Sequence, residues 1–312
     1  MMQTSETEST KPVEPVSLPV MLTVVAALLP AAAVGVFYFG MPALAVLLLS
    51  TAGCVAFEAL SQSLMAREIS VADGSAALTG LLLGMSLPPA APVWMVAIGC
   101  VVAILLGKLE FGDPGYNPFK PALAARVVLL IAFPVRMTTW SPPVGLFTSL
   151  PDAVTATTGT MLAARGVNLL DGLVGHLPGS VGETSVIALA MGGVFLLWRR
   201  VITWHVPISF IGGVAATAAL FAYVNPDRFP GAGFHLVTGG LFLGAIFLAT
   251  DYVASTVTPR GMLIYGAGCG LLTWLIRTFG GYPEGVSFAI LLMNMLRPLI
   301  DRYTGRQALR ET

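Results

Sequence analysis

The side chains best placed to do chemistry lie in the heptad Asp152-Ala153-Val154-Thr155-Ala156-Thr157-Thr158, where a carboxylate is followed by a hydroxyl at every third position. A threonine oxygen can carry a covalent group only where it is exposed and uncrowded. The small residues Ala156 and Gly159 leave room around Thr158. Ser- and Thr-rich loops also commonly hydrogen-bond to their own backbone. The heptad alone therefore leaves a modified threonine and an ordinary loop both open.

The composition indicates an integral membrane protein. Of 312 residues, 56% are hydrophobic and 10% are charged, against roughly 25% charged residues in a soluble domain. The net charge is zero without a basic patch, so nucleic acid is not an expected partner. The three cysteines form no Cys-x-x-Cys pair, which argues against a zinc or iron–sulfur site within this chain. No Walker A loop or G-x-G-x-x-G turn predicts an NAD or ATP domain.

Ten apolar runs predict membrane-spanning helices. They are residues 20–39, 42–60, 74–87, 93–109, 122–135, 184–198, 205–223, 234–249, 262–279 and 285–299. We expect an all-α membrane protein with a disordered tail at 1–17, five helices within 18–135, a hydrophilic connection at 136–183, five helices within 184–301 and a basic tail at 302–312. The first tail lacks the basic start and the cleavage site of a secretory signal.

The distribution of Lys and Arg predicts the orientation of these helices. With the N-terminus in the cytoplasm and ten spans, most of the 16 basic residues fall on the cytoplasmic side. Both termini are then cytoplasmic, and the connection at 136–183 is periplasmic or extracellular.

The chain also contains an internal repeat. Residues 77–84 correspond to 236–244, 98–100 to 267–269, and 111–112 to 279–280. Because the copies are five predicted spans apart, they predict two inverted five-helix repeats, which place sites near the membrane midplane where helices are interrupted. The expected interruptions are Pro88-Pro89 and residues 251–259. A shared Gly- and Ala-rich composition is the alternative explanation.

Charged residues inside spans are costly and commonly functional. Glu58 lies one turn from a span end, where it either reaches the interface or has a buried partner. Arg126 requires a phosphate, a carboxylate or a backbone carbonyl as its partner. Asp251 ends the eighth predicted span. It is either the N-cap of a following half-helix or a cavity-facing contact for a cation or cofactor.

Two Gly- and Pro-rich stretches, 117–121 and 280–285, stand at equivalent helix entries. Backbone N–H groups there could bind polar ligand atoms, or the helices simply end there. The stretch 182–185 predicts a helix start at which Glu183 complements the helix dipole.

Several stretches together resemble the RnfD/NqrB family of membrane redox-complex subunits. These are Asp152-x-x-Thr155-x-x-Thr158, Asn117-Pro118-Phe119-x-Pro121, Gly182-Glu183-Thr184-Ser185, Phe247-Leu248-Ala249-Thr250-Asp251, Phe279-Gly280-Gly281-Tyr282-Pro283-Glu284-Gly285 and the run from Leu291 to Asp301. The resemblance covers nearly all of residues 73–301, and the short N-terminal tail favours the RnfD branch over NqrB. It implies an electron-transfer subunit in the bacterial inner membrane that belongs to an Rnf-type ferredoxin:NAD oxidoreductase. Such a complex translocates Na⁺ or H⁺, and its other subunits contain flavin and iron–sulfur centres.

The resemblance further implies two flavins. FMN would be esterified through its phosphate to Thr158 by a separate flavin transferase that recognises Asp152 and Thr155, and riboflavin would bind non-covalently in the membrane core. A tethered cofactor has a high effective concentration near its electron partners. The family usually has Gly-Ala where this chain has Ala156-Thr157, so Thr157 and Thr160 remain alternative attachment points.

By the same resemblance, Asn117, Glu183 and Thr184 are candidate cofactor contacts, and Asp251 and Glu284 are candidates for the ion pathway. No catalytic or metal-binding residue is expected in this chain. The inverted repeats alone suggest a different function, a secondary transporter or channel for a small solute. A scaffold that has lost its cofactor is a third interpretation.

Overall fold

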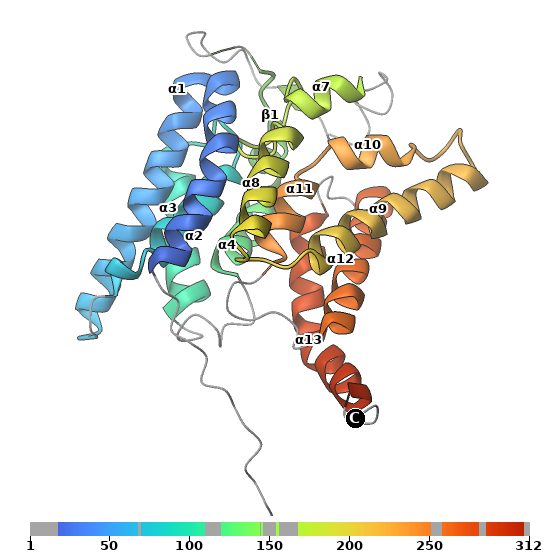
Figure 1. The fold of residues 1–312 in the computed structure, drawn as a ribbon. Coiled ribbons are helices and arrows are strands. Elements are labelled where there is room, and N and C mark those ends of the chain that lie inside the picture. Colours follow the sequence, from blue (N-terminus) through green and yellow to red (C-terminus); the bar gives the residue numbers. More distant parts are fainter. Residues whose placement is uncertain are drawn as a thin grey trace, which may run out of the picture.

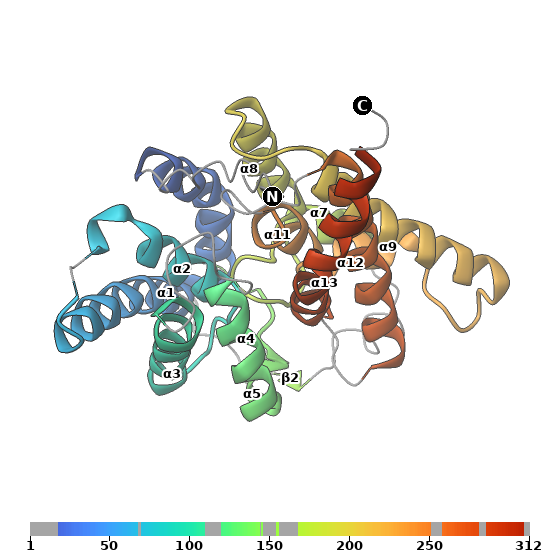
Figure 2. The ribbon, with the colours of Figure 1, turned by 90° about the horizontal axis from the view of Figure 1, so that it is seen from below.

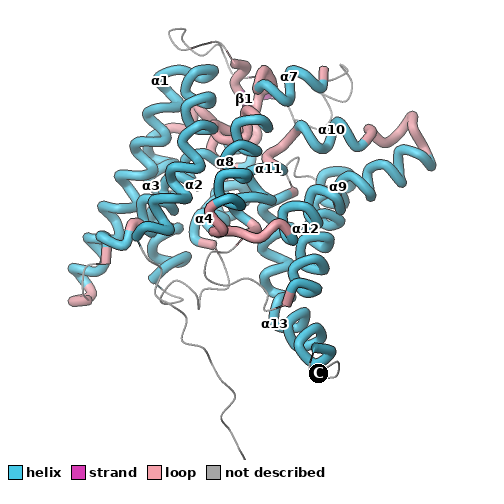
Figure 3. Tube along the Cα trace, in the orientation of Figure 1, coloured by secondary structure: helices cyan, strands magenta, loops and turns pink. Residues whose placement is uncertain are grey.

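The computed structural model describes residues 18–67, 70–109, 120–143, 145, 154–155, 168–250, 258–280 and 285–308. Most of these residues are helical (Figures 1 and 3). Three helices are long and apolar enough to cross a membrane, Leu18–Leu64, His205–Val224 and Pro259–Phe279, and shorter apolar helices accompany them. The chain is therefore a helical membrane protein, as its composition predicts, although several predicted spans are shorter or interrupted.

The first two predicted spans form α1 (Leu18–Leu64), which has a sharp break at Gly40. Gly40 has φ 70° and ψ −155°, a conformation open essentially to glycine alone. In Figure 1 the two arms of α1 form a helical hairpin. The chain reverses where the Gly40-Met41-Pro42 sequence predicts a turn.

The rest of the first half contains α2 (Ser75–Met85), α3 (Val93–Ile104), the π-helical turn η2 (Leu105–Leu109), α4 (Pro121–Ala132) and α5 (Pro134–Met137). α2 is short and almost entirely buried. It approaches α1 closely because Gly80 has no side chain, and a Cβ there would lie 2.4 Å from the carbonyl oxygen of Ser50. The non-helical stretch 86–92 follows α2, so the interruption predicted at Pro88-Pro89 is confirmed.

The connection at 136–183, predicted as a loop, contains regular structure. Strand β1 (Thr139–Trp140) pairs antiparallel with β2 (Val154–Thr155), so that Thr139 lies opposite Thr155 and Trp140 opposite Val154. Helix α7 (Leu169–Val174) lies later in the same connection. The all-α prediction therefore misses a short two-stranded ladder, which includes one residue of the heptad's Asp-Thr-Thr pattern.

The second half contains α8 (Val186–Trp198), α9 (His205–Val224), α10 (Ala232–Val237), α11 (Leu241–Leu243), the π-helical η3 (Gly244–Leu248), α12 (Pro259–Phe279) and α13 (Val286–Ala308). The prediction of one continuous helix at 234–249 is wrong, because Thr238-Gly239-Gly240 separates α10 from α11. Both glycines have positive φ, 68° and 66°, which a right-handed helix does not accept. The interruption predicted at 251–259 falls largely on residues 251–257, outside the described part of the chain.

Seen from below, the helices form two groups (Figure 2). α1, α2 and α3 lie on one side, α9, α12 and α13 lie on the other, and α11 lies between them. α12 approaches α9 closely, since a Cβ on Gly270 would lie 2.6 Å from the carbonyl oxygen of Phe210. Small residues at such contacts are typical of helix packing in membranes, where close backbone approach contributes much of the association energy.

Candidate functional sites

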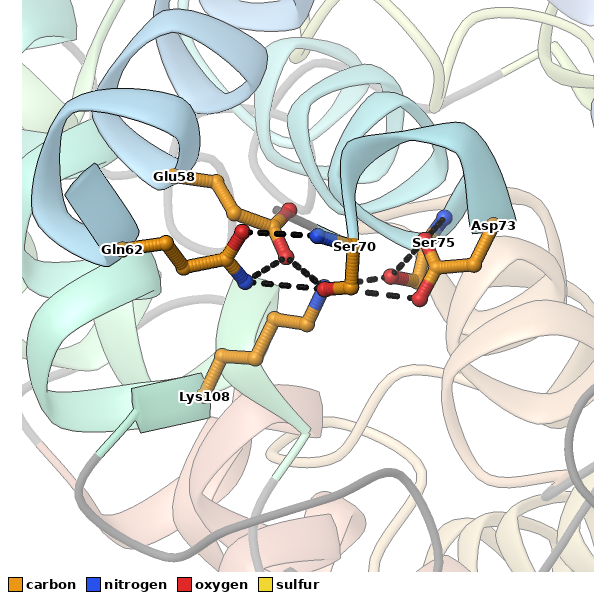
Figure 4. Close-up of polar contacts among 6 residues, drawn as sticks. All are labelled: Glu58, Gln62, Ser70, Asp73, Ser75 and Lys108. Carbon is orange, nitrogen blue, oxygen red and sulfur yellow. Dashed lines mark hydrogen bonds and ion pairs between the residues drawn. The ribbon is translucent and has the colours of Figure 1, made fainter. Parts of the chain in front are cut away.

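A buried ion pair joins the second arm of α1 to η2. The Glu58 side chain is fully buried, and the Nζ atom of Lys108 contacts its Oε1 oxygen (Figure 4). The same Nζ donates a hydrogen bond to the hydroxyl of Ser75 and lies 3.8 Å from Oδ2 of Asp73. The sequence leaves Glu58 open between the interface and a buried partner, and the structure gives it the buried partner.

Further polar groups surround the Glu58 carboxylate. Gln62 Nε2 donates to Glu58 Oε1 at 3.0 Å and to Ser70 Oγ at 2.8 Å. The Ser70 hydroxyl donates to Glu58 Oε1 at 3.1 Å, and the Ser70 N–H donates to Gln62 Oε1 at 2.9 Å. Asp73 Oδ1 accepts from the N–H and hydroxyl of Ser75 at 2.8 and 2.6 Å. We name these residues the Glu58 cluster: Glu58, Gln62, Ser70, Asp73, Ser75 and Lys108 (Figure 4).

Local structure explains why these groups meet. The π-helical turn η2 follows α3 and places Lys108 inside the bundle, and such turns are frequent at functional sites. Gly74, with φ 77°, connects the short 3-10 helix η1 (Val71–Asp73) to α2. Among the described residues, Glu58 Oε2 has no hydrogen-bond partner. A buried carboxylate oxygen of this kind could accept a proton or bind a cation.

A second buried ion pair, Arg126–Glu183, joins α4 to the segment before α8. Arg126 Nη2 donates to Glu183 Oε1 at 2.7 Å, and the two side chains are 2% and 3% exposed. A carboxylate is one of the three partners predicted for Arg126. The helix start predicted at 182–185 is confirmed, because α8 begins at Val186 and its N-cap is Ser185, whose hydroxyl accepts from the Ala188 N–H at 3.3 Å. The Glu183 carboxylate binds Arg126.

Glu183 and Arg277 lie against the break between α10 and α11. A Cβ on Gly240 would lie 2.2 Å from Glu183 Oε1, and a Cβ on Gly239 would lie 2.9 Å from Arg277 Nη2. Arg277 donates to the carbonyl oxygen of Thr238 at 3.0 Å and to that of Gly239. These bonds satisfy carbonyl groups that the broken helix leaves without intrahelical partners, which an apolar environment requires.

The residues predicted for the cofactors and for the ion pathway fall into two sets, those that the structure describes and those that it does not. Thr155 lies in β2, and the buried hydroxyl of Thr184 donates to the carbonyl oxygen of Val181 at 2.8 Å. Asp152, Thr158, Asn117, Asp251 and Glu284 lie outside the described residues. Because its carboxylate binds Arg126, Glu183 is already engaged within the protein, and its role as a cofactor contact stays a prediction.

Two buried polar atoms lie next to the heptad's strand. Trp140 Nε1 and Ser141 Oγ have no hydrogen-bond partner among the described residues, and the residues are 2% and 1% exposed. Trp140 belongs to β1, which pairs with β2. These donors could hold a group supplied from outside the chain.

A family model described as the NQR2, RnfD, RnfE family matches residues 16–310. The chain belongs to this family. Several similar relatives are named as the D subunit of an ion-translocating oxidoreductase complex. One from Halorhodospira halophila is 39% identical over 93% of this chain and 90% of its own length. One from Stutzerimonas stutzeri is 42% identical over 91% and 89%, and one from Escherichia coli O1:K1 is 39% identical over 91% and 92%.

Most residues of the Glu58 cluster could not be recognised from the sequence of this member of the NQR2, RnfD, RnfE family. The sequence singles out Glu58 but does not connect it to Lys108, 50 positions away. One signal was present: an acidic residue inside one apolar run and a basic residue at the end of another both require a counter-charge in a membrane. The order of the helices in space, which decides the pairing, was not in the sequence pattern.

Proposed function

We propose that this chain is the membrane electron-transfer subunit of an Rnf-type, ion-translocating ferredoxin:NAD oxidoreductase complex. The observation that carries the proposal is its similarity, over 91–93% of the chain, to proteins whose names place them in an ion-translocating oxidoreductase complex. Binding of NAD and of iron–sulfur centres belongs to partner subunits, because this sequence has the motif for neither.

In this proposal Thr158 carries FMN as a phosphoester, and Asp152 and Thr155 are recognised by the flavin transferase that forms it. The enzyme transfers the FMN phosphoryl group from a flavin dinucleotide to the Thr158 hydroxyl, so that the pyrophosphate bond of the donor breaks and a nucleoside monophosphate leaves. Support comes from β2, which holds Thr155 in a ladder with β1. Thr158 is three residues beyond Thr155 in the sequence and lies outside the described residues. The residues present fit the group, because Trp140 and Ser141 offer buried donors next to this ladder. FMN supplies the redox chemistry when bound, and the protein supplies its position and environment.

A non-covalent riboflavin in the membrane core is part of the same proposal. Three buried hydroxyls, those of Ser180, Thr273 and Ser287, have no hydrogen-bond partner in the part of the chain that the structure describes. A ligand with several hydroxyl groups can both donate to and accept from such atoms. Asn117 and Thr184 remain candidate contacts.

We also infer two inverted five-helix repeats in a bacterial inner membrane, with cytoplasmic termini and the connection 136–183 on the other side. Lys108 and Arg277 support the repeat, because they follow the corresponding residues Cys100 and Cys269 at equal distance (100 to 108 and 269 to 277). Each reaches the start of a short buried helix. Lys108 binds the first residue of α2, and Arg277 binds the Gly239 carbonyl just before α11.

The Glu58 cluster is our proposed ion-coupling site, in addition to the candidate residues Asp251 and Glu284. Its Lys108 ammonium is a positive charge held among carboxylate and hydroxyl oxygens. Asp73 is 28% exposed and connects the buried Glu58 to the surface. In the inferred orientation this surface is cytoplasmic, so a proton or Na⁺ could enter the cluster from the cytoplasm when Lys108 moves away.

The covalent flavin provides the decisive test. The subunit is co-expressed with a flavin transferase and separated on a denaturing gel under ultraviolet light. The wild-type band should fluoresce, Thr158→Ala should be dark, and the controls Thr157→Ala and Thr160→Ala should stay fluorescent. Mass spectrometry of the peptide spanning residues 137–165 should then show one added FMN. A dark wild-type band would contradict the proposal and favour a transporter or channel.

A further inference from the structure

We propose that Cys54 and Cys100 are a redox-sensitive thiol pair, whose reversible disulfide joins the second arm of α1 to α3 next to the Glu58 cluster. Neither cysteine belongs to the stretches that carry the family resemblance. Formation of the disulfide is independent of the proposed function. Its effect on ion movement rests on that function.

The Cys100 side chain of α3 packs onto one turn of α1. Ser50, Gly53 and Cys54 are three and four positions apart, so they are neighbours on the surface of that helix. The Cys100 thiol donates to the carbonyl oxygen of Ser50 at 3.5 Å, and it is also hydrogen-bonded to the Cys54 thiol. A Cβ on Gly53 would lie 3.0 Å from Cys100 Sγ and 3.6 Å from Cys100 Cβ. The two thiols therefore meet where the absence of a side chain at Gly53 lets α3 approach α1.

This contact is what a disulfide requires, because the bond forms only between cysteines that already lie side by side. Both thiols are free and 0% exposed, so the oxidant has to be small and apolar. Molecular oxygen meets both conditions and dissolves in membranes. Each thiol gives up its proton and one electron as the S–S bond forms, and O₂ takes the two protons and two electrons and leaves as hydrogen peroxide. An added dithiol reverses the reaction by thiol–disulfide exchange.

The disulfide would join the same two segments that the Glu58–Lys108 ion pair joins. Cys54 lies one helical turn before Glu58 in α1. Cys100 lies in α3, which leads directly into η2 and Lys108. A covalent bond between α1 and α3 would restrict the movement of Lys108 away from Glu58. In the proposed function that movement admits the ion, so oxidation should reduce ion movement.

The third cysteine provides a matched comparison. Cys269 is also free and 0% exposed, and it corresponds to Cys100 in the internal repeat. It lies in α12, and the only other cysteines of the chain are the two that contact each other. Cys269 should therefore remain a free thiol under conditions that oxidise the pair.

The first experiment counts thiols in the full-length protein. The protein in detergent is exposed to oxygen-saturated buffer with copper phenanthroline as the catalyst, then denatured and alkylated, and mass spectrometry counts the alkylated cysteines. The wild type should fall from three alkylated cysteines to Cys269 alone, remain a monomer on a non-reducing gel, and recover all three after dithiothreitol. Cys54→Ala and Cys100→Ala should each keep both remaining thiols. Three alkylated cysteines in the oxidised wild type would overturn the proposal, and this result needs no variant to fold.

The second experiment measures ion uptake per electron transferred in vesicles that contain the whole complex. Uptake by the wild type should fall after oxidation and recover after dithiothreitol. The Cys54→Ala complex meets the same oxidant, and its uptake should not change. Gel fluorescence of the flavinylated chain should be equal before and after oxidation. A disulfide that forms without changing uptake would overturn its role beside the Glu58 cluster. A dark wild-type gel band would instead contradict the proposed function and leave the disulfide standing.

Discussion

The Lys108 ammonium lies against the Glu58 carboxylate although 50 positions separate them, and the two side chains are only 9% and 0% exposed. Each charge makes the burial of the other tolerable. In an apolar environment a lone charge is costly, and removing one partner of a buried pair leaves the other uncompensated. The two residues are therefore expected to be energetically coupled.

Removing either charge should cost more stability than removing both. Glu58→Gln or Lys108→Met alone should lower the free energy of unfolding by about 3–5 kcal/mol, and the double variant should recover much of that loss. Thermal unfolding in detergent measures the difference. The Arg297–Asp301 pair is the control, with both side chains 24% exposed and Nε–Oδ2 at 3.7 Å. Asp301→Asn should cost only about 0–1 kcal/mol. Simple addition of the two single losses at Glu58 and Lys108 would argue against coupling.

Ion movement should depend on Glu58 more than flavin loading does. Glu58→Gln removes the negative charge but keeps the size of the side chain, so a cation entering the cluster loses its main attraction. In vesicles that contain the whole complex, Na⁺ or H⁺ uptake during turnover should fall, while gel fluorescence of the flavinylated chain stays at the wild-type level. Asp301→Asn serves again as the control. Normal uptake in a fully loaded Glu58→Gln complex would remove this cluster from the ion pathway.

Position 240, at the helix break beside Glu183, should not tolerate a residue with a side chain. Gly240 has φ 66°, and a Cβ there would lie 2.2 Å from Glu183 Oε1. Gly240→Ala should therefore destabilise the protein by at least about 1–3 kcal/mol from backbone strain, with displacement of the Arg126–Glu183 pair as an added cost. Gly212→Ala is the matched control, because a Cβ at that position in α9 meets nothing within 4 Å. It should be neutral or stabilising by up to about 1 kcal/mol. Equal melting temperatures for the two variants would contradict the strain argument.

The sequence predicts well those structural features that a few neighbouring residues determine. The reversal at Gly40 and the end of α2 before Pro88-Pro89 follow from single glycine and proline residues with few backbone choices. The break at 238–240 was missed, because hydropathy over 234–249 responds to side chains and ignores the backbone. The adjacent Gly239 and Gly240, both at positive φ, were the available signal.

The contacts between distant segments could not be read from the sequence in the same way. The sequence predicts that Arg126 needs a phosphate, a carboxylate or a backbone carbonyl as its partner, and only packing selects the Glu183 carboxylate. Likewise the β1–β2 ladder has two residues in each strand, too short to give an alternating pattern. The placement of Thr155 opposite Thr139 is therefore a product of the tertiary structure.

That placement gives Thr155 two possible roles, which one pair of substitutions separates. If a transferase recognises the Thr155 hydroxyl, Thr155→Val should reduce covalent flavin, because valine keeps the shape and the strand preference of threonine but has no hydroxyl. Thr139→Val, on the opposite strand of the same ladder, should leave the flavin at the wild-type level. Gel fluorescence per unit of protein measures both. Equal losses in the two variants would mean that the ladder, rather than the hydroxyl, is what flavin attachment requires.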